Sequence, residues 1–334
     1  MNFALTQEQQ VFAESIARFA RDQLADGALA RAHSAAYPWD VARALARQGL
    51  MGITMPEADG GQGGSLMDAV IAIQTLARYC PKSADVCQAG NFGPIRTFAE
   101  YASAEQKARF LPGLLGGEML MSLGMSEPDA GSAVTDLKTV ARRDGDGWVI
   151  DGSKVFSTHS PEATLFLVYV RFGPGVGGIG SVLIERGTPG LTVGRPSAFM
   201  SGEQWCQLDF ENCRIPDANV LLGPGGFKKQ IQGFNVERIG NASRSLAVGR
   251  YAFEQARALA RVRDFGVELQ PIDRAGLVPD GRMRASIGRR QRDEVAVEVL
   301  DLVSVAHPDG RVGRHIGEER IGRVRLTGLV PKFA

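Results

Sequence analysis

The chain has 334 residues, of which 44% are hydrophobic and 22% are charged, and its formal net charge is +1. This length suggests two or three domains with sizeable cores. The near-zero charge does not favour nucleic acid or an anionic membrane as a partner, and no apolar run is long enough for a membrane span.

The few cysteines and histidines also limit the chemistry. The four cysteines, Cys80, Cys87, Cys206 and Cys213, have neither the spacing of a zinc site nor that of a disulfide framework. The four histidines are widely scattered, so no metal site is expected. The N-terminal residues do not resemble a secretory signal peptide, and we therefore expect a cytoplasmic protein.

Residues 1–120 have the apolar periodicity of helices. A capping box beginning at Thr6 precedes the first of them. Pro38 suits the first turn of a second helix. A glycine-rich loop at residues 56–64 then precedes an apolar helix from Leu66 to Ala77.

Residues 121–222 have the pattern of strands and turns. Asp151 and Gly152 are predicted to form a tight turn between two strands. The strand candidates are Trp148–Ile150, Lys154–Phe156, Leu165–Arg171, Ser181–Glu185 and Leu208–Phe210.

Residues 173–178 formally satisfy the dinucleotide-binding pattern G-x-G-x-x-G. Pro174 and the strand-like residues that follow leave no helix N-terminus to face a pyrophosphate. We therefore predict a hairpin loop. Helical periodicity resumes after residues 223–227 and continues to about Arg261. The tail beyond Gly266 is rich in Arg, Gly and Pro, with one short apolar helical stretch at Val295–Val305.

The turn Gly124–Ser132, with the sequence GMSEPDAGS, joins the helical part to the strand-rich part. Its composition alone is typical of an ordinary domain junction, but the string closely resembles the signature of acyl-CoA dehydrogenases. Two more strings are similar to that family in the expected order, PEADGGQGG at 56–64 and FENCRIP at 210–216. The resemblance covers roughly residues 5–265, and the family's later helices have no counterpart beyond Gly266.

The resemblance implies an α+β multidomain fold. We expect a helical N-terminal domain (1–120), a central antiparallel β-barrel-like domain (121–222), and the start of a C-terminal helical domain (223–266). Residues 267–334 form a divergent tail for which the resemblance implies no structure.

The resemblance also implies a site for FAD. Leu123, Met125 and Ser126 would line the isoalloxazine ring, and Ser132 would lie at a phosphate end of FAD or of the acyl-CoA. The remaining candidates are Phe156 over the flavin face, Thr158 near flavin N5, and Arg263 and Phe265 across a dimer interface. Without the resemblance, Phe156 would be interpreted as an ordinary core aromatic.

Glu237 is the candidate catalytic base, because some family members carry the base on this helix. A carboxylate in an apolar, water-poor pocket has a raised pKa and can remove a proton near neutral pH. Arg238 would orient the substrate or screen enolate charge, and Asn235 and Ser132 would contact the substrate. The alternative is that Glu237 and Arg238 form a solvated charge pair at a helix start.

The implied activity is FAD-dependent α,β-dehydrogenation of an acyl-CoA thioester in fatty acid metabolism. The resemblance further implies an electron-transfer flavoprotein as the onward acceptor and a homodimer or homotetramer. Two other classes remain open at this point. One is a different oxidase or monooxygenase reaction of flavin on the same scaffold, and the other is an inactive, truncated homologue, which the unusual tail favours.

Overall fold

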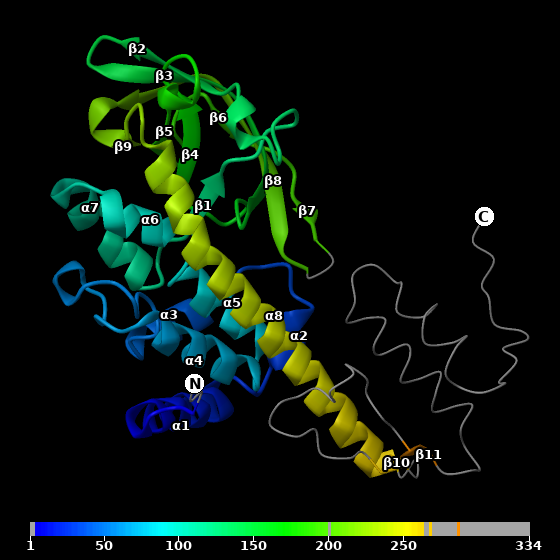
Figure 1. The fold of residues 1–334 in the computed structure, drawn as a ribbon. Helices are drawn as coiled ribbons and strands as arrows, with labels where there is room; N and C mark the ends of the chain where they lie inside the picture. Colours follow the sequence, from blue (N-terminus) through cyan, green and yellow to red (C-terminus); the bar gives the residue numbers. More distant parts are fainter. Residues whose placement is uncertain (1–3, 200–201, 264–266, 269–285, 288–334) are drawn as a thin grey trace, which may run out of the picture. The chain divides into compact units, whose positions relative to one another are not determined.

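The computed structural model describes residues 4–199, 202–263, 267–268 and 286–287 (Figure 1). The chain divides into two units, Met1–Val248 and Gly249–Ala334. All the residues that line the cavity described below lie in the first unit. In the second, a two-residue antiparallel pair joins β10 (Val267–Glu268) to β11 (Ser286–Ile287). The predicted apolar stretch Val295–Val305 lies outside the described residues.

Helices make up the first part of the chain, as the periodicity predicts. The capping box at Thr6 is confirmed, since its hydroxyl accepts the backbone N–H of Gln9 at 3.2 Å and its own N–H donates to the Gln9 side chain at 3.1 Å. Capping boxes at Ser65 and Ser103 start two further helices in the same way. The helices are α1 (Gln7–Gln23), α2 (Ala28–Ala32), α3 (Trp39–Arg47), α4 (Leu66–Ala77), α5 (Pro81–Ala89), α6 (Pro94–Tyr101) and α7 (Ala104–Leu115).

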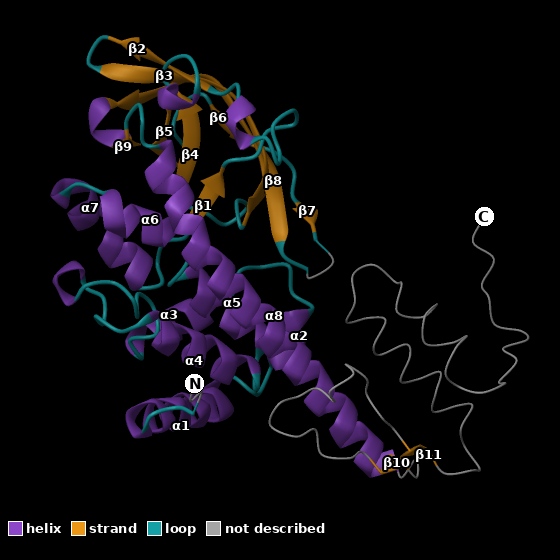
Figure 2. Ribbon diagram, in the orientation of Figure 1, coloured by secondary structure: helices purple, strands orange, loops and turns teal. Residues whose placement is uncertain are grey.

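A nine-stranded sheet follows the helices (Figure 2). It is mixed rather than wholly antiparallel, because β1 pairs with β4 in parallel. The described strands pair along an open path from β6 to β9, so barrel-like closure stays a prediction. The strands are β1 (Met121–Gly124), β2 (Val140–Asp144), β3 (Gly147–Thr158), β4 (Leu165–Arg171), β5 (Ile179–Glu185), β6 (Leu191–Val193), β7 (Ser197–Ala198), β8 (Gln204–Pro216) and β9 (Val220–Leu222).

Strand β3 corrects one prediction. The expected tight turn at Asp151 and Gly152 is wrong, because β3 runs unbroken through both residues beside β8. The register shifts between Ile150 and Gly152 instead, which marks a bulge. Gly152 has φ +143°, and a Cβ there would lie 2.6 Å from the Thr139 hydroxyl oxygen, so only glycine fits this bulge. The hairpin loop predicted at residues 173–178 is confirmed between β4 and β5.

The central strand β4 is buried on both faces, which explains its unbroken apolar sequence. Leu165 and Leu167 pack in one core cluster with residues of α6, α7 and β1. Phe166 and Val168 alternate with them and pack on the opposite face, with residues of β3 and β8. Helices therefore pack against one face of β4, and residues of β3 and β8, which belong to the same sheet, pack against the other.

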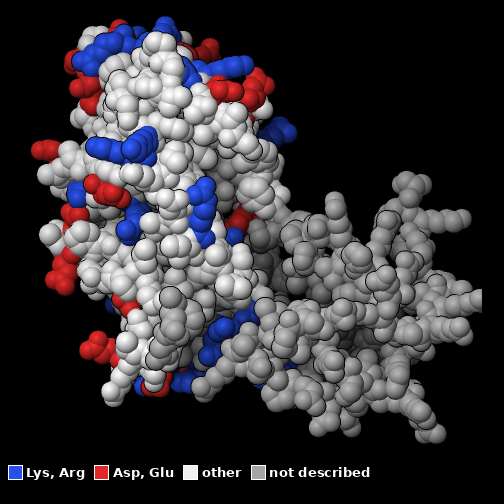
Figure 3. All heavy atoms as spheres, in the orientation of Figure 1, with Lys and Arg blue, Asp and Glu red and all other residues white. Residues whose placement is uncertain are grey.

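Helix α8 (Phe227–Arg263) follows β9, and Figure 1 shows it passing β1, α6 and α5. No helix among the described residues is long and apolar enough to cross a membrane. Figure 3 shows basic and acidic side chains lying together over the β2–β3 end of the sheet. There Arg142 pairs with Asp151, and Arg143 pairs with Asp217 at 2.5 Å. These exposed pairs balance charge and contribute little stability.

Candidate active site

A cavity of about 370 Å³ lies within the first unit, lined by α5, α6, β1, the end of β3 and α8. Predicted site residues from distant parts of the sequence meet in its wall. They are Leu123, Met125, Ser126, Phe156, Thr158, Glu237 and Arg238.

Four other predicted site residues are not among those that line the cavity in the described part of the chain. Ser132 and Asn235 are exposed and do not line the cavity. The Asn235 side chain instead accepts a hydrogen bond from Arg238 Nη1 at 3.0 Å. Phe265 and the side chain of Arg263 lie outside the described residues.

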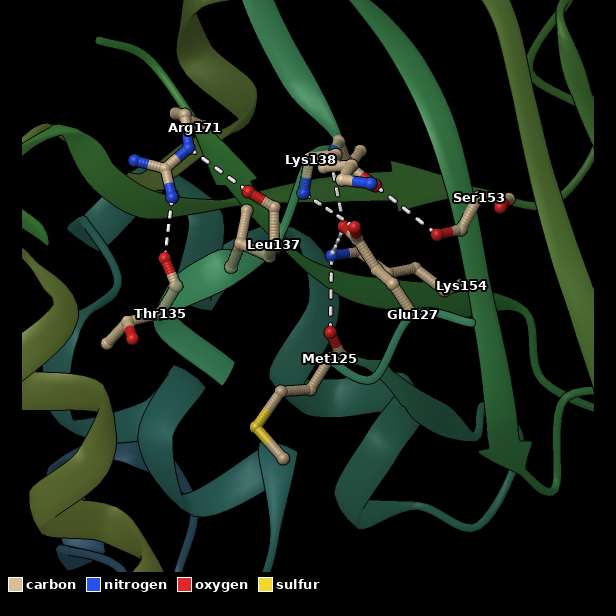
Figure 4. Close-up of polar contacts among 9 residues, drawn as sticks. Met125, Glu127, Thr135, Leu137, Lys138, Ser153, Lys154 and Arg171 are labelled. Atoms are coloured by element: carbon tan, nitrogen blue, oxygen red, sulfur yellow. Dashed lines mark hydrogen bonds and ion pairs between the residues drawn. The ribbon is translucent and has the colours of Figure 1, made fainter. Parts of the chain in front are cut away.

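The carboxylate of Glu127 holds the turn that carries Met125. Glu127 is buried in the protein, and its side chain lies at the centre of Figure 4. Glu127 Oε1 accepts the Lys154 ammonium at 2.7 Å and the Thr139 N–H at 2.9 Å. Its Oε2 accepts the Lys138 N–H at 2.5 Å, and Lys154 also donates to the Met125 carbonyl at 3.2 Å. Burial raises the pKa of Glu127, but the charge and hydrogen bond of Lys154 outweigh it and hold that pKa below its ordinary value. The turn is therefore fixed by a buried ion pair.

Hydrogen bonds also join this part of the chain to the end of β3, which carries Phe156 and Thr158. The Val155 N–H donates to the Ser126 carbonyl at 2.8 Å. The Ser122 hydroxyl donates to the Thr158 carbonyl at 2.6 Å. The two segments of the cavity wall are thus held at a fixed separation.

Phe156 is not a core residue, so that interpretation is wrong. Its side chain is 56% exposed, and its ring centroid lies 4.7 Å from that of Trp205. Its φ is +57°, a left-handed conformation that is rare for a bulky residue and costs energy. An exposed aromatic held in a strained backbone at a cavity is typical of a binding site rather than of a core.

Glu237 lies partly buried where α8 faces α5 and α6. Its Oε1 accepts Gln88 Nε2 at 3.3 Å and Asn241 Nδ2 at 3.2 Å. The backbone N–H of Gly93 also hydrogen-bonds to this carboxylate, and a Cβ on Gly93 would lie 3.2 Å from Oε2. Oε2 accepts no side-chain hydrogen bond from the described residues. Burial raises the pKa of Glu237 above its ordinary value, against the hydrogen bonds from Asn241 and Gln88 and the charge of Arg244. The alternative of a solvated pair with Arg238 does not fit these contacts.

Three charged residues that the sequence did not predict line the same cavity: Asp85 of α5, Glu203 just before β8, and Arg244 of α8. Arg244 Nη1 donates to Asp85 Oδ1 and, at 2.7 Å, to Glu203 Oε1, and the two carboxyls share a hydrogen bond. Burial raises the pKa of Asp85 to about 7, against the charge of Arg244. Burial also opposes ionisation of Glu203, but the hydrogen bond with Asp85 and the charge of Arg244 hold its pKa at about 2. Near neutral pH the pair can therefore share one proton.

One signal in the sequence could have found this cluster. Asp85 and Gln88 are three residues apart on a helix that is otherwise largely apolar, so they share a face. Arg244 follows Glu237 by seven residues, which also places both on one face of α8.

His159 lies beside the cluster, with Nε2 3.7 Å from Asp85 Oδ2 and its ring centroid 5.6 Å from that of Tyr37. Burial lowers the pKa of His159 to about 4, so the imidazole is neutral at physiological pH. Asp85, His159 and Glu203 could each offer a ligand atom within 4.8 Å of the others. The Arg244 guanidinium already supplies a cation to both carboxylates, so the cluster does not require a metal ion for charge balance.

Comparison with known proteins identifies the family. Residues 6–118 match the domain described as "Acyl-CoA dehydrogenase, N-terminal domain", and residues 122–213 match "Acyl-CoA dehydrogenase, middle domain". The chain belongs to the acyl-CoA dehydrogenase family.

Two curated relatives show how far this similarity extends. An acyl-CoA dehydrogenase of Bacillus subtilis is 29% identical, over 78% of this chain and 70% of the relative. A 3-sulfinopropanoyl-CoA desulfinase of Paraburkholderia xenovorans is 31% identical, over 78% of this chain and 69% of the relative. The family therefore includes members with different reactions.

Three solved structures share the fold. Butyryl-CoA dehydrogenase of Megasphaera elsdenii has a TM-score of 0.70 and 26% identity, over 91% of this chain and 76% of that chain. The prolyl acyl carrier protein oxidase AnaB has a TM-score of 0.70 and 26% identity, over 77% and 70%. The FAD complex of PigA has a TM-score of 0.72 and 25% identity, over 78% and 70%.

Proposed function

We propose that this chain is an FAD-dependent oxidoreductase that dehydrogenates an acyl thioester between its α and β carbons. The observation that carries the proposal is the shared cavity. It unites a carboxylate with a raised pKa, Glu237, with the turn at Met125 and Ser126 and the β3 residues Phe156 and Thr158. A base, an apolar platform and hydroxyl groups are what this reaction needs side by side.

The residues present fit FAD. Leu123, Met125 and Phe156 offer apolar surface for a flat ring, and Ser126 and Thr158 offer hydroxyls for its polar edge. Phe156 is exposed and strained, so an aromatic ligand would cover a surface that the chain itself leaves open. FAD, when bound, supplies the acceptor for the β-hydrogen and its bonding electron pair.

In this proposal Glu237 removes the α-proton. The raised pKa keeps the carboxylate basic enough to accept this proton, and Oε2 has no side-chain partner among the described residues. As the proton moves to Oε2 and the β-hydrogen leaves with its electron pair, the double bond forms between the two carbons. Gln88 and Asn241 orient the carboxylate by holding Oε1.

Arg238 and three outlying residues have lesser roles in the proposal. Arg238 lines the cavity and, held by Asn235, would orient the thioester or screen enolate charge. Ser132, outside the cavity wall, would meet a phosphate of FAD or of CoA. Arg263 would contact a flavin across a dimer interface.

The onward electron acceptor is proposed to be an electron-transfer flavoprotein, and the active form a cytoplasmic homodimer or homotetramer. The thioester carrier is proposed to be coenzyme A, as the names of the curated relatives favour. A carrier-protein thioester is the second candidate, since AnaB, at 26% identity, is named for such a substrate.

Product analysis tests the proposal. The FAD-loaded protein would be incubated with short acyl-CoA thioesters and an artificial electron acceptor, and the thioesters would be examined by mass spectrometry. The proposal predicts a product that lacks two hydrogen atoms, and formation of this product should require FAD. Unchanged thioester in the presence of bound FAD would contradict it.

A further inference from the structure

Strands β1 and β3 both contribute to the cavity wall, although they are not paired with each other. Among the described strands, β1 pairs with β4, whereas β3 pairs with β2 and β8. Leu123 of β1 and Thr158 of β3 nevertheless line the same cavity. Side chains rather than a backbone ladder therefore have to hold these two strands at a fixed separation.

Two buried serine hydroxyls make this connection, and each reaches the backbone of the other strand. Ser122 Oγ of β1 donates to the Thr158 carbonyl at 2.6 Å, and Ser157 Oγ of β3 donates to the Leu123 carbonyl at 2.8 Å. The two hydroxyl oxygens lie 2.9 Å apart, which is also a hydrogen-bonding distance. Ser122 is 1% exposed and Ser157 is 0% exposed, so a carbonyl that loses its serine has no bulk water to replace it. We call Ser122 and Ser157 the serine clamp.

The serine clamp holds an irregular part of β3. The register between β3 and β8 shifts between Lys154 and Ser157. Phe156 and His159 have φ values of +57° and +60°, which are costly for residues other than glycine and persist only where surrounding contacts hold them. Ser157 and Thr158 lie between these two strained residues. The clamp therefore fixes the segment of β3 that has the most reason to relax.

We propose that Ser122 and Ser157 are positioning residues of the flavin site, which hold Thr158 at a fixed distance from Leu123. This inference rests on the proposed function, in which FAD binds in the cavity and Thr158 offers a hydroxyl to the flavin. Ser157 is not among the described residues that line the cavity, so it acts on FAD only through its neighbours. Because the clamp fixes the Thr158 carbonyl, it also fixes the direction in which the Thr158 side chain leaves the backbone.

Fluorescence titration with FAD tests the role of the clamp. Ser122→Ala leaves the Thr158 carbonyl without its donor, and Ser157→Ala does the same to the Leu123 carbonyl. We expect each substitution to weaken FAD binding about tenfold. Ser181→Ala is the matched control, because Ser181 of β5 is equally buried but its hydroxyl has no hydrogen-bond partner among the described residues. It should leave FAD affinity unchanged. Wild-type affinity in both clamp variants overturns the proposal.

A second background separates positioning from a general loosening of the fold. In Thr158→Ala the side chain that the clamp positions is already absent, whereas its backbone carbonyl remains. Adding Ser122→Ala to this variant should therefore weaken FAD binding by about twofold or less. An equal loss in both backgrounds would mean a purely structural role and would overturn the proposal. Urea unfolding without FAD shows which variants are folded, and Ser157→Ala, which keeps the bond from Ser122 to Thr158, replaces Ser122→Ala in this comparison if the latter does not fold.

Failure of this proposal is distinguishable from failure of the proposed function. Wild-type protein that binds FAD but is not bleached by any acyl thioester contradicts the dehydrogenase reaction and leaves the role of the clamp intact. Clamp variants that bind FAD as the wild type does contradict only the role of the clamp. Wild-type protein that binds no FAD overturns both.

Discussion

Lys154 and Glu127 form an ion pair inside the protein. The Lys154 Nζ lies 2.7 Å from Glu127 Oε1, and the two side chains are 0% and 5% exposed. Glu127 also accepts the backbone N–H groups of Lys138 and Thr139, and Lys154 donates to the Met125 carbonyl. One buried pair therefore fixes the turn that lines the cavity and joins it to β3.

Lys154→Met should destabilise the fold by about 3–5 kcal/mol, because it leaves the Glu127 carboxylate buried without its cation. Lys138→Met is the matched control. Lys138 pairs with Asp129 on the surface, where the two side chains are 74% and 72% exposed, so its loss should cost about 1 kcal/mol or less. Urea denaturation of both variants measures the difference, and equal losses would show that the buried pair has no special role.

The position of Phe156 predicts that its substitution affects cofactor binding more than folding. Phe156→Ala should cost about 1 kcal/mol of stability, since it removes mainly the contact with Trp205. Phe166→Ala, in the core, should cost about 3–5 kcal/mol. We expect Phe156→Ala to weaken FAD binding about tenfold or more, as measured by fluorescence titration. Unchanged FAD affinity would remove Phe156 from the flavin site.

Burial of neutral His159 predicts a loss of stability in mild acid. Its pKa is lowered from 6.5 to about 4 in the folded protein. The unfolded chain therefore binds the proton first as the pH falls, and the contribution of His159 to stability is lost between about pH 6.5 and pH 4. One pH unit below 6.5 the loss is about 1.4 kcal/mol.

Comparison with His159→Gln isolates this effect from the titration of Asp85 and Glu203. The free energy of unfolding of the wild-type protein should fall more steeply between pH 7.5 and pH 5.5 than that of the variant. Parallel curves would mean that His159 becomes protonated without unfolding, contrary to its burial.

Local sequence signals predicted much of the fold. Capping boxes such as that at Thr6 and apolar runs such as Leu165–Arg171 act over short distances, and the structure confirms both. The bulge at Gly152 was misread as a turn, because its conformation depends on the approach of Thr139 from the neighbouring strand. Parallel pairing of β1 with β4 likewise depends on contacts between distant segments.

The site was predicted only where a motif marked it. Glu237 and Phe156 were found through the resemblance, and both line the cavity. Asp85, Glu203 and Arg244 were missed, because they come from three distant segments and form a cluster only after folding. Ser132 belongs to the best-matched motif and yet lies outside the cavity wall, so a motif identifies a segment more reliably than each of its side chains.

The central claim is that Glu237 removes a proton while FAD accepts the hydride, and anaerobic reduction of the bound flavin tests it most directly. Wild-type protein, Glu237→Gln and the exposed control Glu211→Gln would each be loaded with FAD and mixed with an acyl-CoA thioester in a stopped-flow instrument. The flavin absorbance should bleach in the wild type and in Glu211→Gln. In Glu237→Gln, which should bind FAD equally well, bleaching should be slower by about 10²–10⁴-fold. Bleaching of Glu237→Gln at the wild-type rate, or flavin-loaded wild type that no acyl thioester bleaches, would contradict the account.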